Sequence, residues 1–423
     1  MRCRPAPFLL VAVGLGLQAL PTAALLLPQV GSLAHTGSAR CRGGAPALLA
    51  TKKKKKKASA ARPNKISTRG FGGRGAAAQA GAVLLEEPRY EALYAWLRSS
   101  PSTNLHKVGV ADFGGLRGVM ALQDIAAGEE IVGIPASFAV DLGAENSDPL
   151  PAAQRLLAVM HSEMAPACDD DDGDDDNAPQ LPSSPRAVYW STLPPPDSPD
   201  LCTPDFFSEK ELQMLQWPPL VLQVRQRSAR IRAALGAAAP SGAMGVESLS
   251  AAGGSMRELR WAVWAVLSRV LTVAGPANAA TLGGGAASGR KLLIPFLDMF
   301  NHRGGTKHYL TGRTDGMLRV VAGAPVKAGD QIFIQYGVPE STSNEEFVGH
   351  YGFCDPSVAA AGADSALVRA HRDALPALSF SSVEEDEALL SSTPAPPYKE
   401  QLALSLRLAL KRAAAREGLL PSA

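Results

Sequence analysis

The first 85 residues contain no aspartate or glutamate, although they hold fourteen lysines and arginines. Residues 1–27 have the pattern of a signal peptide, with Arg2 and Arg4 ahead of an apolar stretch over residues 8–20. Residues 31–82 combine alanine, glycine, serine and basic residues without acids, which is typical of an organelle transit peptide. We therefore expect residues 1–85 to be a disordered presequence that directs the chain to a plastid (chloroplast) through the secretory route. Secretion or a mitochondrial location are the alternatives.

Long hydrophobic runs are lacking after this presequence. Pro21 interrupts the first apolar stretch, and no later segment reaches the ~20 apolar residues that a transmembrane helix needs. The sequence predicts no membrane span. With 423 residues, the chain is long enough for two or three domains with their own cores.

Cysteine is scarce as well. Two of the five cysteines, Cys3 and Cys41, fall in the presequence. The other three, Cys168, Cys202 and Cys354, are far apart and odd in number. They indicate neither a disulfide framework nor a Cys-x-x-Cys zinc site, and they fit a reducing compartment.

Three low-complexity segments are best explained as loops. The six lysines at residues 52–57 lie inside the presequence and are typical of a solvated run, so no nucleic-acid partner is expected. The aspartates at residues 169–176 lack the spaced ligands of a calcium loop. The glycine-rich residues 283–289 are not followed by the Lys-Ser/Thr of a phosphate loop.

The remaining chain alternates between two hydrophobic patterns. Residues 108–140 and 292–335 have the pattern of short strands joined by turns. Helical patterns occupy the segments around them, which are residues 86–97, 186–275 and 357–423. The last helix of the middle segment is expected over residues 256–273. The predicted fold class is therefore α+β.

One short pattern occurs twice in the strand regions. Ile125-Ala-Ala-Gly-Glu-Glu-Ile131 and Val326-Lys-Ala-Gly-Asp-Gln-Ile332 both run from an apolar residue through Ala, Gly and an acid to Ile. Glycine supplies the positive φ of a tight turn, while the acid faces water. We expect two β-hairpin units that complete one small β domain, with a helical insertion between them at about residues 150–275.

Polar residues interrupt these strand regions in three places. The apolar run LLIPFLDMFNH contains Asp298, Asn301 and His302. The other two places are Gly115-Leu-Arg-Gly-Val119 and Gln335-Tyr-Gly337, the latter followed by Asn344-Glu-Glu-Phe-Val-Gly-His-Tyr-Gly-Phe353. In this order, and with the paired turns, they resemble the SET-domain methyltransferases. The large helical insertion makes the chain similar to the branch that includes Rubisco large-subunit lysine methyltransferase and actin-histidine methyltransferase.

The resemblance implies a SET β-fold of short strands and hairpins over about residues 86–356, with the helical insertion inside it. Nuclear histone-lysine enzymes usually end in a cysteine-rich zinc segment, whereas only Cys354 occurs here, so the non-histone branch is favoured. Residues 357–423 then form a short helical C-terminal region. The seventy residues after Phe353 are few for the helical substrate-binding domain of the family, which implies a reduced domain or a different mode of recognition.

The resemblance also implies S-adenosylmethionine (AdoMet) as cofactor. Glycines let the main chain approach such a ligand closely, an amide reads its polar edges, and a guanidinium fork suits its carboxylate. The residues that match the family's cofactor-binding positions are Gly115, Leu116, Arg117, Arg269, Asn301 and His302.

The same resemblance assigns the acceptor side of the site. Tyr336 matches the catalytic tyrosine, Tyr351 an aromatic wall of the substrate channel, and Asp298 a substrate-side acid. A lysine amine has a pKa of ~10.4 and must lose its proton before it attacks the methyl group, which burial promotes. Positioning would then supply most of the acceleration, and no strong general base is needed.

The predicted activity is methylation of a lysine in a non-histone protein, such as the Rubisco large subunit or another plastid protein, by a monomeric enzyme. A histidine acceptor and a non-catalytic SET-fold binding module stay open. A metallohydrolase is a further alternative because Asp298 and His302 have the i, i+4 spacing of metal ligands. No clear third ligand accompanies them, so no metal site is predicted.

Overall fold

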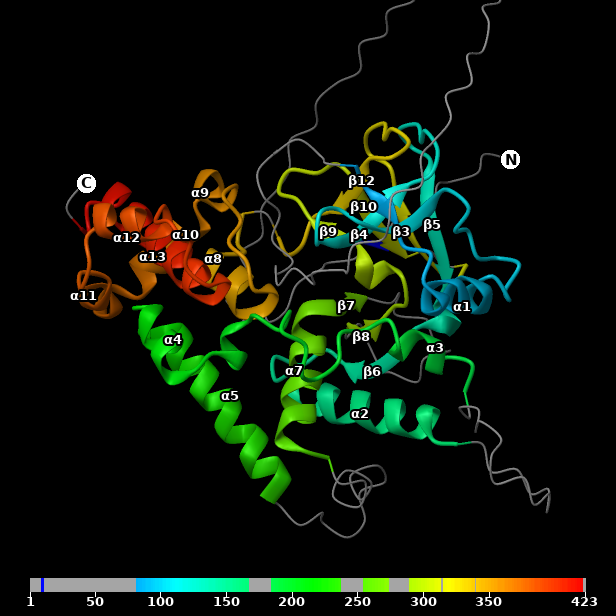
Figure 1. Cartoon of the computed structure of the whole chain (residues 1–423), viewed down its shortest axis with the longest axis horizontal. Coiled ribbons are helices and arrows are strands. Elements are labelled where there is room, and N and C mark those ends of the chain that lie inside the picture. The colour runs from blue at the N-terminus through cyan, green and yellow to red at the C-terminus, as the bar shows by residue number, and fades with distance from the viewer. Residues whose placement is uncertain are drawn as a thin grey trace, which may run out of the picture. The chain divides into compact units, whose positions relative to one another are not determined.

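The structure, a computed structural model of the chain, describes residues 9–10, 81–166, 184–236, 254–273, 289–312, 315–338 and 340–420 (Figure 1). The predicted presequence, except Leu9, Leu10 and residues 81–85, lies outside the described residues. So do the aspartate run and residues 283–288. Among the helices within these ranges, none is both long and apolar enough to cross a membrane.

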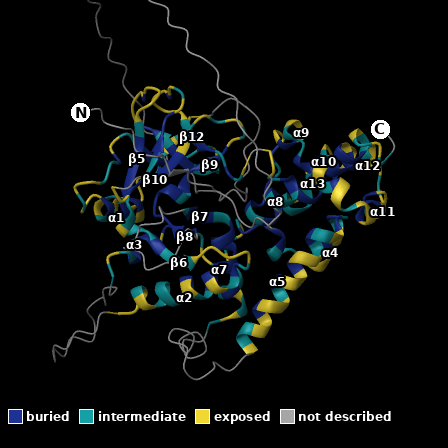
Figure 2. Cartoon of the chain, turned by 180° about the vertical axis from the view of Figure 1, so that it is seen from behind, coloured by how far each residue is buried: buried dark blue, intermediate teal, exposed yellow. Residues whose placement is uncertain are grey.

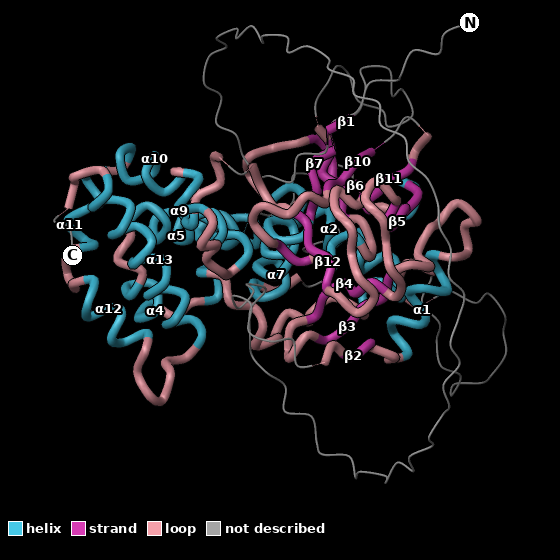
Figure 3. Tube along the Cα trace, turned by 90° about the horizontal axis from the view of Figure 1, so that it is seen from above, coloured by secondary structure: helices cyan, strands magenta, loops and turns pink. Residues whose placement is uncertain are grey.

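Short strands form three small sheets, which confirms the predicted α+β class (Figure 3). The first sheet has the order β1 (Leu9–Leu10), β10 (Tyr309–Gly312), β11 (Met317–Val321), β5 (Glu130–Pro135). The second has the order β2 (Val83–Leu84), β3 (Val108–Asp112), β4 (Arg117–Ala121), β12 (Gln331–Ile334), β9 (Asn301–His302). The third has the order β6 (Val140–Ala144), β8 (Arg290–Leu293), β7 (Val270–Val273). Only β9 and β12 pair in parallel, which places the end of β9 beside the end of β12 among the described strands.

The two Ala-Gly-acid turns are not hairpins, contrary to the sequence-based expectation. Each turn carries the chain from one sheet to another, from β4 to β5 and from β11 to β12, and the strands then pair as β4 with β12 and β5 with β11. Ile125 and Val326 bridge the turns with two backbone hydrogen bonds of 2.9 Å. Gly128 N donates to the Ala322 carbonyl, and Gly329 N donates reciprocally to that of Ala121.

The last helix of the insertion is shorter than predicted. α7 spans Met256–Arg269, starting at a capping box between Ser255 and Glu258. The chain then extends into β7, which pairs with β8, instead of continuing as a helix to Val273. The segment Val-Leu-Thr-Val of β7 is mostly β-branched, and it gains a sheet partner that a further helical turn would lack. Arg269 therefore lies at the junction of helix and strand.

The remaining helices surround these sheets and build the C-terminal region. Before the insertion they are α1 (Pro88–Leu97) and η1 (Ala136–Phe138), and within it they are α2 (Leu150–Met164), α3 (Ala187–Trp190), η2 (Pro204–Phe206), α4 (Glu209–Met214) and α5 (Pro218–Gly236). After β12 they are α8 (Asn344–Glu346), the π-helix η5 (Phe347–Tyr351), α9 (Val358–Ala361), α10 (Ala363–Ala370), η6 (Arg372–Ala374), α11 (Leu375–Leu378), α12 (Val383–Leu390) and α13 (Tyr398–Arg416). Figure 2 shows the buried residues gathered in the strands and on the inner sides of these helices.

Two hydrophobic cores hold together the residues that the structure describes. The first joins the sheets with α1, α2 and α7. The second joins the C-terminal helices with α4 and the first half of α5, including the fully buried Trp217 and Leu220. α5 contributes to both cores, because Val224 packs in the second and Ile231 in the first. The C-terminal region thus completes its core with helices from the insertion.

His350 of η5 packs at this junction and predicts a dependence of stability on pH. Burial, reinforced by the positive charge of Arg227, lowers the pKa of His350 from 6.5 to about 3. Below pH 6.5 the unfolded chain binds a proton at this imidazole that the folded chain does not bind, so acid favours unfolding.

We expect the His350 contribution to lower the free energy of unfolding by about 2 kcal/mol between pH 6.5 and pH 4.5. Urea unfolding of the wild type and of His350→Gln at both pH values measures it. The variant should lose less stability on acidification than the wild type. Equal losses would show that His350 is not buried in its neutral form.

Candidate functional site

The chain reaches the site through a strained aromatic corner. η4 (Leu297–Met299) follows β8, and Phe296 precedes it with a φ of 71°, a rare value for a residue other than glycine. The fully buried Phe296 ring packs against Tyr94 and Phe300, with centroid distances of 6.1 Å to both. This packing stabilises the corner from which the two residues of β9 enter the second sheet with buried side chains.

Asn301 lies against the loop that leads into β4. Its Nδ2 donates a hydrogen bond of 2.7 Å to the Arg117 carbonyl. A Cβ atom on Gly118 would lie 2.8 Å from this nitrogen and 2.2 Å from Nε2 of Gln331, so the position requires glycine. Nε2 of Gln331 is buried and has no hydrogen-bond partner among the described residues. The amide side chains of Asn301 and Gln331 therefore both face this loop, and the Gln331 NH₂ is a donor that could bind a ligand.

The loop itself holds the predicted Gly-Leu-Arg residues. Gly115 adopts a φ of 92°, and its N–H donates to Oδ1 of Asp112 at 2.6 Å. Leu116 is partly exposed. The Arg117 guanidinium extends away from the loop, where Nη1 donates to the Thr192 carbonyl at 2.5 Å. The loop thus presents main-chain groups, rather than the arginine side chain, beside the asparagine.

His302 is held at both ring nitrogens. Nδ1 accepts a hydrogen bond of 2.9 Å from the backbone N–H of Tyr336, and Nε2 lies 2.9 Å from Oδ2 of Asp355. Because a nitrogen that accepts cannot carry a proton, this pattern assigns the proton to Nε2, which donates to the carboxylate. Burial opposes ionisation of Asp355, but the bonds from His302 and Ser357 outweigh it and lower the pKa of this carboxyl.

Aromatic rings surround His302 on the side of η5. Its ring lies 4.8 Å from Phe347, 5.3 Å from Tyr336 and 5.6 Å from Phe353, with the last pair stacked. The Tyr336 and Tyr351 rings are 4.8 Å apart. The site therefore has an aromatic wall of four rings around the imidazole.

The hydroxyls of this wall stay protonated. Burial raises the pKa of both Tyr336 and Tyr351 above the ordinary phenol value. The Tyr336 hydroxyl donates to the Phe300 carbonyl, which fixes the orientation of its oxygen. Tyr336 is thus suited to hydrogen bonding and positioning, not to proton abstraction near neutral pH.

Arg269 and Asp298 form a buried ion pair. Nη1 of Arg269 lies 3.0 Å from Oδ2 of Asp298 and 3.2 Å from its carbonyl oxygen. The two side chains are 2% and 0% exposed, so water does not screen this pair. Burial and the nearby Arg117 lower the pKa of Arg269, while Asp298 opposes this shift. The Tyr189 phenol lies next to the same carboxylate, and burial together with that charge raises its pKa.

A small cavity joins the ion pair to the aromatic wall. It has a volume of about 10 Å³ and is lined by Ser268, Arg269, Asp298, Tyr336 and Tyr351. Such a volume admits about one water-sized group. The structure thus brings four of the predicted site residues to one enclosed point, and places Arg269 on this side rather than beside Asn301.

Comparison with known proteins identifies the fold. No protein-family model matches the chain, and no curated protein matches it either. The structure of Rubisco LSMT bound to AdoMet matches with a TM-score of 0.54 and 16% identity, covering 78% of this chain and 90% of that chain. The SET domain of LSMT bound to lysine and AdoHcy matches with a TM-score of 0.52 at the same identity and coverage. The chain has the SET-domain fold. At this identity the likeness shows the fold alone, so the activity is argued from the site.

Sequence reasoning missed three residues of this SET domain. Ser268 lines the small cavity, Phe347 packs against His302, and Asp355 holds the imidazole. A local signal existed for Ser268, which adjoins Arg269, whereas the Asp-Pro-Ser turn at Asp355 indicates a turn and not a contact with His302.

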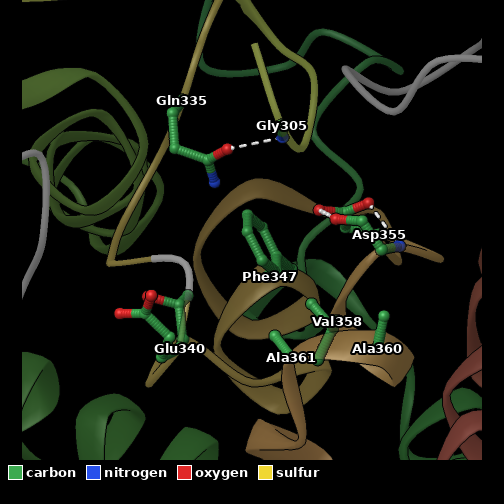
Figure 4. Close-up of a pocket in the computed structure, with 10 residues that line it drawn as sticks. Gly305, Gln335, Glu340, Phe347, Asp355, Val358, Ala360 and Ala361 are labelled. Atoms are coloured by element: carbon green, nitrogen blue, oxygen red, sulfur yellow. Dashed lines mark hydrogen bonds between the residues drawn. The ribbon is translucent and has the colours of Figure 1, made fainter. Parts of the chain in front are cut away.

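A larger cavity of about 360 Å³ lies on the other side of this turn (Figure 4). Phe347 and Asp355 both line it, together with Gln335, Glu340 and the start of α9. Figure 4 shows Asp355 at its wall, with Gln335 bonded to Gly305 opposite.

Among the described residues, no group of three His, Cys, Asp or Glu is arranged to hold a metal ion.

Proposed function

We propose that this chain is an AdoMet-dependent protein methyltransferase that modifies a lysine amine. The observation that supports it most is the enclosed cavity between Tyr336, Tyr351 and the Arg269–Asp298 pair. The SET-domain fold adds support, because the matched Rubisco LSMT structures hold AdoMet, AdoHcy or sinefungin, and lysine or monomethyllysine.

The residues around Asn301 fit the cofactor. The space that a Cβ on Gly118 would fill is taken by the Gln331 and Asn301 side chains, and the Gln331 amide keeps a buried donor without a partner among the described residues. Gly115, Leu116 and Arg117 would meet the methionine end through main-chain groups. Asn301 would hold the polar edges with its amide and His302 with its main chain, because both ring nitrogens of His302 are already bonded. When bound, AdoMet supplies an electrophilic methyl group on a sulfonium cation.

The enclosed cavity fits an amine acceptor. Removing a lysine ammonium from water disfavours its charged form, so the cavity promotes loss of the proton that blocks attack. Asp298 offsets the charge of Arg269, and the positive charge of the nearby Arg117 disfavours an ammonium beside this pair. The Tyr336 and Tyr351 rings confine the nitrogen, and their protonated hydroxyls align it.

The substrate that we propose is a non-histone plastid protein, and the enzyme is proposed to act as a monomer. The proposal of a plastid rests on the acid-free residues 1–85, which follow the order of a signal peptide and a transit peptide.

Binding and labelling measurements test this function. The full chain should bind AdoMet in isothermal titration calorimetry and should transfer labelled methyl groups to protein in a plastid extract. Mass spectrometry of the labelled protein should find methyl-lysine. Methyl-histidine would replace the lysine assignment, and binding without labelling would favour a non-catalytic module. Activity that is lost to chelators and indifferent to AdoMet would indicate the metallohydrolase.

A further inference from the structure

His302 connects the aromatic site to a residue that no sequence motif singled out. On one side its Nδ1 receives the Tyr336 backbone N–H, and on the other its Nε2 contacts Asp355, both at 2.9 Å. The imidazole is 6% exposed, so water cannot replace either partner. The position of the Tyr336 backbone is therefore coupled to the tautomer of one ring.

Only one tautomer satisfies both contacts. With the proton on Nε2, the ring donates to Asp355 and accepts from Tyr336. With the proton on Nδ1, two N–H groups would face each other at Tyr336, and a buried donor would lose its partner, which costs about 1–3 kcal/mol. A carboxylate, which only accepts, selects the first tautomer.

Asp355 is itself held in place from several directions. Its Oδ1 accepts from Ser357 N at 2.9 Å, and its Oδ2 accepts from Ser357 Oγ at 2.5 Å. Its backbone N–H donates to Oδ1 of Asn344 at 2.7 Å. The Asn344 backbone N–H and Nδ2 in turn donate to the two oxygens of Asp364 on α10, at 2.8 and 2.7 Å. A continuous chain of hydrogen bonds thus runs from α10 in the C-terminal region to Tyr336.

We propose that Asp355 is a positioning residue for methyl transfer, which fixes the Nε2–H tautomer of His302 and through it the backbone of Tyr336. The inference rests on the proposed function. Asp355 lines the large cavity and touches neither the small cavity nor the loop at Asn301, so it acts through His302 alone.

Asp355→Asn tests this role with almost no change of shape. If the amide oxygen keeps the bond from Ser357 N, its NH₂ faces Nε2 and forces the proton onto Nδ1. If the amide is flipped, its NH₂ faces the Ser357 N–H and that bond is lost. The first orientation inverts the tautomer of His302 and breaks its bond with the Tyr336 N–H. The flipped orientation keeps the tautomer and breaks the bond from the Ser357 N–H.

The matched control is Asp386→Asn. Asp386 is also fully buried, but it pairs with Arg407 and Lys411 between α12 and α13, remote in the fold from His302. This variant loses stability in the second core without touching the chain of bonds described above. Comparing the two variants separates a general loss of stability from a specific effect on the imidazole.

The first readout is the tautomer of His302. Long-range ¹H–¹⁵N spectra of histidine-labelled full chain distinguish the two tautomers among its seven histidines, and His302→Asn identifies the relevant signals. The wild type and Asp386→Asn should show the Nε2–H form, and Asp355→Asn should show the Nδ1–H form or a mixture. In folded Asp355→Asn, a lowered kcat together with an unchanged tautomer would overturn the proposal, because the loss of turnover would then not act through the imidazole.

The second readout is kinetic. In Asp355→Asn we expect kcat to fall about tenfold while the Kd for AdoMet stays within about twofold, because the Asn301 contact with the loop is unaltered. Asp386→Asn should keep its kcat at temperatures where it is folded. An unchanged kcat in Asp355→Asn, or equal losses in both variants, would contradict the positioning role. A wild-type chain that neither binds AdoMet nor labels protein would instead overturn the proposed function, and this inference with it.

Discussion

We expect the replacement of Tyr336 with phenylalanine to lower kcat for methyl transfer about 100-fold, while the Kd for AdoMet changes by no more than about twofold. Its hydroxyl lies at the wall of the small cavity and donates to the Phe300 carbonyl. Removing the hydroxyl leaves that carbonyl without this donor and removes a preorganised polar group next to the acceptor nitrogen. The ring remains, so the packing on His302 and Tyr351 is preserved.

Single-turnover labelling and calorimetry measure the two quantities separately. The matched control is Tyr94→Phe, because the Tyr94 hydroxyl also makes one hydrogen bond, accepting from Val110 N at 2.8 Å, but does not line the cavity. Tyr94→Phe should lower stability with no comparable loss of turnover. Turnover that survives in Tyr336→Phe would show that the hydroxyl is not needed for alignment.

The sequence was sufficient to predict which segments meet at this site. Asn301 and Arg117 are far apart in the chain, yet the glycine at position 118 already marked a place of close approach, and in the structure the Gln331 and Asn301 side chains lie where its Cβ would be. The polar residues within an apolar run likewise marked the point where a buried element reaches the site. Each signal is local and weak by itself, and it is the resemblance of the three motifs, in their order, to the SET-domain methyltransferases that joined these segments at one site.

The topology was less accessible, because it depends on partners that are distant in the sequence. A tight turn with glycine at positive φ looks the same whether it joins two strands of one hairpin or carries the chain between two sheets. The reciprocal backbone hydrogen bonds between Ile125 and Val326, and those of their neighbours, show that each turn joins two sheets and does not close a hairpin. In the same way, the apolar residues 270–273 continue the period of α7, and pairing with β8 overrides that pattern.

Asp355 was not predictable for a different reason. Its role arises from a contact with His302, and nothing in a single Asp-Pro-Ser turn indicates which ring it will face. The second core poses the same difficulty, since Trp217 of the insertion packs with helices that follow it by more than a hundred residues.

The second large effect concerns the Arg269–Asp298 pair. Arg269→Met should lower the free energy of unfolding by about 3–5 kcal/mol, because it leaves a carboxylate buried without its main partner. Asp298→Leu should be more harmful than Arg269→Met. It leaves two guanidinium groups, Arg269 and Arg117, close together in a site from which water is excluded, and Arg117 already lowers the pKa of Arg269.

Urea unfolding of the two single variants and of the double variant Arg269→Met/Asp298→Leu measures these losses in the free energy of unfolding. The double variant should recover most of the loss, since an apolar pair of similar volume carries no desolvation penalty. The residual loss then reports the bond from Arg269 to the Asp298 carbonyl and its packing on Trp264, where the guanidinium lies 5.1 Å from the ring centroid.

The double variant also separates stability from chemistry. It should fold and yet transfer methyl groups poorly, because an apolar cavity cannot hold the polar amine with compensating hydrogen bonds. A double variant as unstable as Asp298→Leu would mean that the pair is needed to pack the junction of α7 and β7. A stable double variant with full turnover would mean that neither charge contacts the acceptor, and the cavity would have to orient the amine through Tyr336 and Tyr351 alone.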